Sequence, residues 1–176
     1  MYGFPDRRVR VYKELSINLL NNKTMNKWFL AKVRYEKATE KGMNKKVTEI
    51  YLVDALSFTE AEMRITEEMK PFINGEFQVC ALSMANYSEW FPSERVEDDK
   101  WYRVKVSWIS VDEKSNKEKR SSWYALVESD STANAEKYFH NRMKGTLGDY
   151  IVESVSETTI MDVYPYSTEE VNDDNR

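Results

Sequence analysis

Few side chains of this 176-residue chain are suited to covalent or metal chemistry, since it has one cysteine, Cys80, and one histidine, His140. A cysteine nucleophile needs a nearby base, and zinc sites and catalytic triads need several such partners, so this pair cannot complete either. Cys80 lies in the apolar stretch "QVCALSM", which predicts a buried structural thiol. His140 lies in "KYFHNRM", and we expect it on the exposed or flanking side of a helix.

Carboxylates are abundant, but they occur in runs such as "TEEM" and "EDD", which are typical of solvated faces. A metal site built from carboxylates alone remains an alternative. The sequence has no phosphate-binding glycine loop and no paired-histidine zinc motif. We therefore predict a protein that is not an enzyme and needs no cofactor or metal.

Aromatic and cationic residues recur in one pattern, in "KWFLAKVRYEK" from Lys27 and "KWYRVKVSWIS" from Lys100. Side chains alternate between the two faces of a strand, so each stretch has a core face and an outward face. We expect a tyrosine of each following strand to join the outward face. The predicted outward residues are Trp28, Lys32, Arg34 and Tyr51 in the first half, and Trp101, Arg103, Lys105, Arg120 and Tyr124 in the second.

Trp and Tyr beside Lys and Arg on a sheet are what proteins use to bind single-stranded nucleic acid, because rings stack on bases and cations contact phosphates. The net charge of −4 shows that such binding would be local to these faces. The same aromatics also suit a purely structural role, either covering the edge of a core or filling an interface between two halves. An interaction module, such as an adaptor or inhibitor of a host protein, is the alternative function, because aromatics and Arg suit protein interfaces. The sequence also leaves open whether the protein forms a homo-oligomer.

An internal duplication positions these residues. Residues 73 apart coincide along the chain, among them Trp28 with Trp101, Gly75 with Gly148, and Tyr51 with Tyr124. The helix fits better at 74, where Met69 meets Met143, which indicates a one-residue slip. Two copies predict two similar units related by a pseudo-twofold axis.

Each unit has the pattern of two strands, a helix and one or two further strands. In the first unit, Ser57 with Glu60, or Thr59 with Glu62, can form a capping box at the start of the helix. We predict an α+β fold in which each antiparallel sheet carries one packed helix. The predicted organisation is a basic N-terminal extension (1–25), a first ββαβ unit (26–97), a second (98–166) and an acidic, disordered tail (167–176).

Several strings, "WFLAKVRYEK", "KKVTEIYLVDALSFTEAE", "MKGT" and "SVSETTIMDVYPY", resemble a small protein family of gut-type anaerobic bacteria and their phages, classified as a domain of unknown function. The resemblance covers residues 25–166. It implies a compact intracellular protein of bacterial or phage origin, and it supplies no catalytic residues. With no signal peptide or membrane helix in the sequence, we expect the protein in the cytoplasm, which is the host cytoplasm if a phage encodes it.

Overall fold

The computed structural model describes residues 27–40, 42–112, 114, 116–146 and 148–166. The predicted basic extension (1–25) and acidic tail (167–176) lie outside these residues. Within the described residues the fold is α+β, as predicted, with eight strands in two four-stranded sheets and one helix packed near each sheet.

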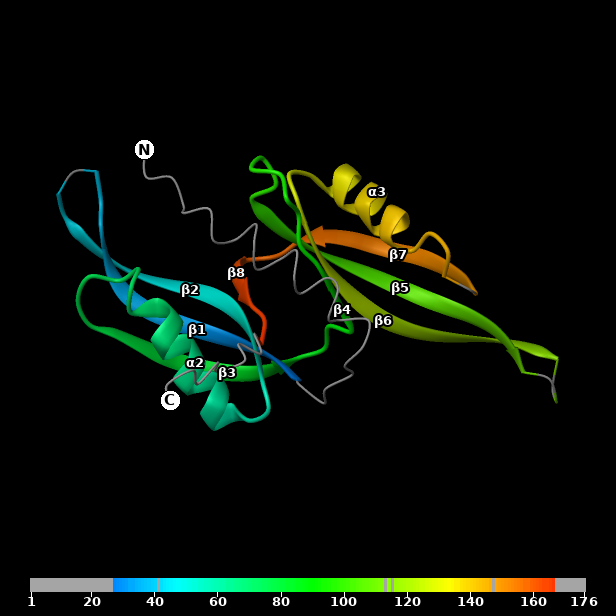
Figure 1. Cartoon of the computed structure of the whole chain (residues 1–176), viewed down its shortest axis with the longest axis horizontal. Coiled ribbons are helices and arrows are strands. Elements are labelled where there is room, and N and C mark those ends of the chain that lie inside the picture. The colour runs from blue at the N-terminus through cyan, green and yellow to red at the C-terminus, as the bar shows by residue number, and fades with distance from the viewer. Residues whose placement is uncertain (1–26, 41, 113, 115, 147, 167–176) are drawn as a thin grey trace, which may run out of the picture.

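Both halves of the chain contain the same order of elements (Figure 1). The first half contains β1 (Lys27–Ala38), β2 (Asn44–Ala55), α2 (Phe58–Met69), β3 (Phe77–Ala85) and β4 (Glu89–Phe91). The second half contains β5 (Lys100–Asp112), β6 (Lys117–Ser129), α3 (Thr132–Arg142), β7 (Asp149–Glu157) and β8 (Ile160–Tyr164).

The two halves exchange their last strands. The first sheet has the order β3-β1-β2-β8 and the second has the order β4-β6-β5-β7. Thus β8 from the second half pairs with β2, and β4 from the first half pairs with β6, both in parallel. In Figure 1, β8 lies among the elements of the first half, and β4 lies beside β6. Each sheet is therefore completed by the other half of the chain.

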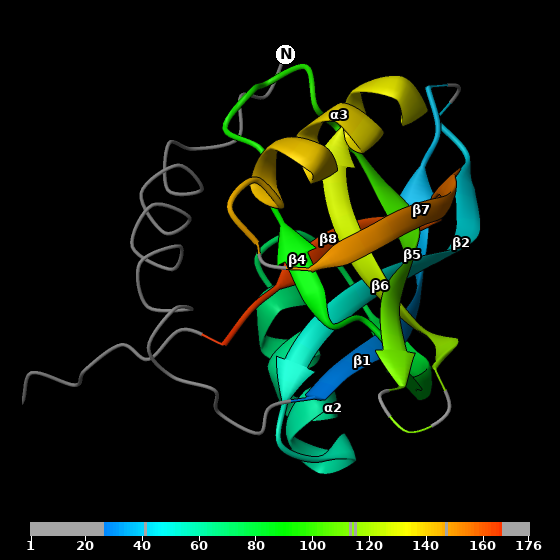
Figure 2. The same ribbon diagram turned by 90° about the vertical axis from the view of Figure 1, so that its right-hand side faces the viewer.

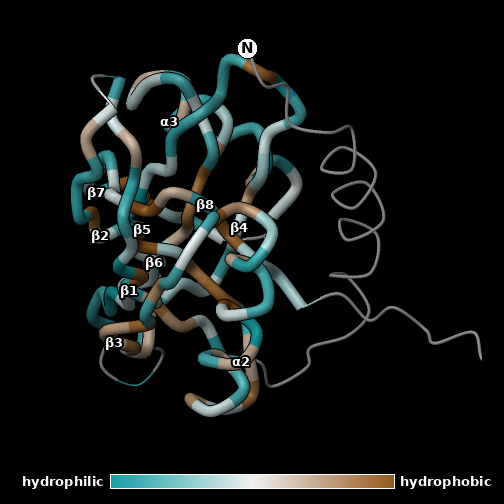
Figure 3. The backbone as a smooth tube through the Cα atoms, turned by 90° about the vertical axis from the view of Figure 1, so that its left-hand side faces the viewer, coloured by the Kyte–Doolittle hydropathy of each residue, from teal (hydrophilic) through white to brown (hydrophobic). Residues whose placement is uncertain are grey.

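The molecule is layered, with α2 on one side of the first sheet and α3 on one side of the second. Ala31 and Val33 of β1 pack with Ile65 and Met69 of α2, and a matching core lies between the second sheet and Phe139 of α3. Figure 2 shows the strands of the two sheets crossing between the helices. Several hydrophobic segments gather where they cross (Figure 3). Each sheet thus buries one face against its helix and part of the other face against its partner sheet.

Both helices begin at a serine cap. The Ser57 hydroxyl accepts a hydrogen bond from the Glu60 amide at 3.2 Å, and the Glu60 carboxylate accepts one from the Leu56 amide at 2.8 Å. Ser131 accepts a bond from the Asn134 amide at 3.3 Å. The first of the two predicted capping pairs, Ser57 with Glu60, is therefore confirmed. The Ser57 side chain satisfies an amide that the helix itself leaves unpaired.

The slip between the two copies begins earlier than the helix. Phe29 pairs with Val53, whereas its counterpart Tyr102 pairs with Val127, so the second strands correspond at 74 residues rather than 73. In the pairing of the third strand with the first, a β-bulge lies between Lys32 and Val33 in the first half. The bulge of the second half lies 73 residues further along, between Lys105 and Val106. The second copy therefore gains one residue in its hairpin and loses it before its third strand. A one-residue shift turns every side chain of a strand to the opposite face.

Candidate ligand-binding surface on the first sheet

Three tryptophans join the two sheets. The Trp90 ring, on the exchanged strand β4, lies 6.2 Å from the Trp28 ring and 6.5 Å from the Trp101 ring, centroid to centroid. Trp101 is only 2% exposed, and Trp28 is half-buried at the rim of the same core. The expectation that Trp101 faces outward to a ligand is wrong, because the second sheet face is buried between the halves. This is the structural alternative that the sequence left open.

Tyr51 also differs from its predicted place. It pairs with Ala31 on the side of the first sheet that faces α2, and it is 8% exposed. The reason is the slip in the hairpin, which makes Ala125 its counterpart instead of Tyr124. Tyr124 itself lies on the expected face, opposite Lys105, and is half-buried.

A polar cluster surrounds Tyr51 that the sequence reasoning missed. The Tyr51 and Tyr35 hydroxyls both donate to one carboxylate oxygen of Glu49, at 2.6 and 2.8 Å. Burial and the Glu49 carboxylate raise the pKa of Tyr35 to about 12, and the same causes raise the pKa of Tyr51. Burial alone would raise the pKa of Glu49, but the bonds from both tyrosines, with Lys37 nearby, hold it below its ordinary value.

The second half fills the same position with apolar rings. Trp108 and Trp123 stack there with ring centroids 6.1 Å apart, on the side of the second sheet that packs against α3. The available signal for the polar version was the placing of Glu49 two residues before Tyr51, because residues two apart on a strand share a face. The two copies have therefore diverged at this place in the fold.

The exposed part of the first sheet carries three cations on the face turned away from α2. Lys32 and Arg34 come from β1 and Lys46 comes from β2, and all three are exposed. Within the described ranges, none of them has a carboxylate at ion-pair distance, although Glu36 stands across from Lys46 in the strand register. We call Lys32, Arg34 and Lys46 the cationic face.

The corresponding face of the second sheet is largely neutralised. Lys105 binds Glu153 at 2.5 Å, and Arg120 binds Glu118 at 2.7 Å. The bond with Glu153 raises the pKa of Lys105, and the bonds from Lys105 and then Ser107 lower the pKa of Glu153. Arg103, the fifth predicted cation, is exposed, and its guanidinium lies 5.6 Å from the centre of the Tyr124 ring. The two faces that the sequence made look alike are therefore unequal.

An open cleft of about 1060 Å³ continues the cationic face at the end of the first sheet. β3 pairs with β1 only as far as Tyr35, so residues 36–38 extend past it. The loop from α2 to β3 lies at the same end of the sheet as the β1–β2 hairpin (Figure 1). Arg34 and Lys46 line this space with Phe72, Asn74 and Gln78. We call it the end cleft.

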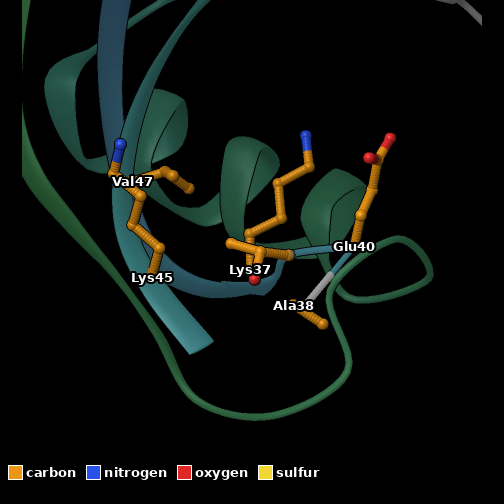
Figure 4. Close-up of a pocket in the computed structure, with 6 residues that line it drawn as sticks. Lys37, Ala38, Glu40, Lys45 and Val47 are labelled. Carbon is orange, nitrogen blue, oxygen red and sulfur yellow. The ribbon is translucent and has the colours of Figure 1, made fainter. Parts of the chain in front are cut away.

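A smaller hollow of about 470 Å³ lies on the hairpin itself. Lys37, Glu40, Lys45 and Val47 are among its lining residues, and Lys37 and Glu40 extend to the same side (Figure 4). Its charges are mixed, and it has no aromatic lining. The end cleft is the better candidate for a site.

The two residues suited to covalent chemistry, Cys80 on β3 and His140 on α3, lie in different halves of the fold. Cys80 is exposed, so the prediction of a buried thiol is wrong; it is the extra residue of the bulge in β3, and its Sγ lies 3.3 Å from the Lys32 carbonyl. His140 is exposed on α3, as expected, and its Nδ1 lies 2.9 Å from the Tyr150 hydroxyl. The described part of the chain contains no cluster of His, Cys, Asp and Glu that could hold a metal ion.

A family model described as a domain of unknown function (DUF4494) matches residues 27–166. The chain belongs to this family. The match begins with β1 and ends just after β8, so a DUF4494 domain contains both copies and both exchanged strands. A comparison with curated proteins finds no match. Among the described helices, none has the length and apolar character needed to cross a membrane.

Proposed function

We propose that this DUF4494 protein binds single-stranded nucleic acid on the exposed part of its first sheet. The observation that supports this is the cationic face: Lys32, Arg34 and Lys46 lie exposed beside an open cleft, and no carboxylate among the described residues pairs with them. Residues two apart on a strand lie about 7 Å from each other, so Lys32 and Arg34 offer successive contacts along an extended backbone. The proposed role is non-enzymatic.

The contacts differ from those expected from sequence. Trp101 and Tyr51 are excluded by burial, and Trp28 is only partly accessible because it is half-buried. The paired cations of the second sheet contribute less, because a cation already bound to a carboxylate gains less from a phosphate. We further propose a cytoplasmic role in phage replication or recombination, which is supported by the resemblance of the strands to proteins of gut anaerobes and their phages.

The test is the binding of a fluorescein-labelled dT20 oligonucleotide, followed by anisotropy between 50 and 300 mM salt. Three phosphate contacts on a single strand predict a slope of log K against log salt of about −2. The Lys32→Gln/Arg34→Gln/Lys46→Gln variant should lose roughly 100-fold in affinity at 0.1 M salt, about fivefold for each contact.

The matched control is Lys105→Gln/Arg120→Gln, which removes two paired cations from the second sheet and should change affinity little. Binding that is equally strong in the triple variant, or no binding below about 10 µM at 50 mM salt, contradicts the proposal. Capture of a stoichiometric protein partner that survives nuclease treatment, with no oligonucleotide binding, favours the adaptor or inhibitor alternative.

A further inference from the structure

We infer that the end cleft holds one nucleotide of the bound strand, with its base against Phe72 and its phosphate between Arg34 and Lys46. This inference rests on the proposed function and adds the ligand of one defined site. Both cations belong to the cationic face and also line the cleft. A strand that crosses the sheet along these cations therefore reaches the cleft without a change of surface.

Phe72 is suited to stacking because it is exposed on an anchored loop. Its side chain is 59% exposed, whereas the next residue, Ile73, is buried in the core beneath α2. The amides of Phe72 and Ile73 both donate to the Met69 carbonyl, at 3.0 and 3.1 Å. Pro71, which fixes its own backbone angle, precedes them. The backbone that carries the ring is thus held in position before any ligand arrives, which lowers the entropic cost of binding.

The remaining lining suits a base rather than a chain of phosphates. Asn44, Asn74 and Gln78 supply amide groups, which both donate and accept hydrogen bonds as the edges of bases require. Glu36 and Glu76 also line the cleft; their carboxylates can accept bonds from base amino groups, and they repel additional phosphates. The cleft should therefore prefer a nucleoside monophosphate to a triphosphate.

The second half does not repeat this arrangement. Thr146 stands where the first half has Phe72, because its amide donates to the Met143 carbonyl as the Phe72 amide donates to Met69. Ser107 stands where the first half has Arg34, 73 residues further along the chain. Ser107 is buried and bonds to Ser122 and Glu153. The inferred nucleotide site is therefore single in the described part of this pseudo-symmetric chain.

Two probes test the inference: labelled dA20 by anisotropy, and free adenosine monophosphate by calorimetry and by NMR of the Asn and Gln side-chain amides. Because one base stacked on an aromatic ring changes affinity by about 5- to 150-fold, Phe72→Ala should weaken dA20 binding by that factor and leave the salt slope unchanged. Adenosine monophosphate should bind, should bind more tightly than the triphosphate, and should shift the amide signals of the cleft. The control is Met84→Ala, which removes an exposed apolar side chain of the first sheet that lies outside the cleft.

The outcomes separate this inference from the proposed function. If the triple cation variant loses dA20 binding but Phe72→Ala does not, the nucleotide site is refuted and the cationic face stands. If adenosine monophosphate binds and Phe72→Ala abolishes it while dA20 does not bind, the site stands for a free nucleotide and the polymer proposal fails. If neither probe binds, both are overturned. Circular dichroism melts of Phe72→Ala should show an unchanged fold, since the side chain is exposed.

Discussion

Replacing Trp90 with alanine tests whether the exchanged strand β4 holds the two sheets together. Trp90 is 6% exposed, and its ring lies between those of Trp28 and Trp101. Truncating a buried aromatic side chain costs about 3–5 kcal/mol, and the two indole neighbours favour the upper part of that range. For a chain of this size, 1 kcal/mol corresponds to roughly 2–4 °C, so the melting temperature should fall by about 6–20 °C.

The measurement is urea unfolding followed by far-ultraviolet circular dichroism, because fluorescence would change with the tryptophan itself. The midpoint should fall while the slope with urea is preserved, as expected for a change in stability alone. Val96→Ala is the control, since Val96 is 94% exposed in the loop after β4 and should alter stability by less than about 0.5 kcal/mol. A loss below about 1 kcal/mol for Trp90→Ala would show that this cluster does not hold the sheets together.

Three further predictions follow from single features. Glu49→Gln should weaken the dependence of stability on pH. Because the folded-state pKa of Glu49 is lowered, its contribution to stability is complete above its ordinary pKa of 4.5 and is lost as pH falls through the lower folded value. Melting temperatures that change with pH equally in both proteins between about pH 7 and pH 3 contradict this. Ser57→Ala should lower the free energy of unfolding by roughly 0.5–2 kcal/mol, and Ser57→Asp, which can still cap α2, should not; equal losses in urea unfolding would rule out the cap. A chain divided within residues 92–99 should reassemble one-to-one from its two pieces in size-exclusion chromatography, because each piece lacks a strand of its own sheet; a piece that is folded and monomeric alone refutes the exchange.

The duplication, the order of elements and the position of the helices were readable from sequence. These depend on local signals: alternating apolar residues for the strands, the serine caps at Ser57 and Ser131, and glycines at equivalent turns. Such signals act over a few residues, so they survive without knowledge of what packs against them. The free cations Lys32 and Arg34 were also identified correctly as exposed, because their positions alternate with the core residues of the same strand.

The faces of the second strands and the fate of the tryptophans were decided by tertiary structure. One additional residue in the second hairpin made Ala125 the counterpart of Tyr51, and only the pairing register with β1 shows this. The strand exchange likewise depends on contacts between distant segments, such as β8 with β2, that leave no local pattern.

By itself, the sequence determined that this chain contains two copies of one α+β unit, each with a strand in which a tryptophan and cations share one face. The tertiary structure decided what that face meets: the partner sheet at the tryptophans, carboxylates along the second copy, and solvent along the first. The physical reason is that alternation along a strand specifies two faces, whereas burial of either face depends on which surfaces the rest of the chain brings against it.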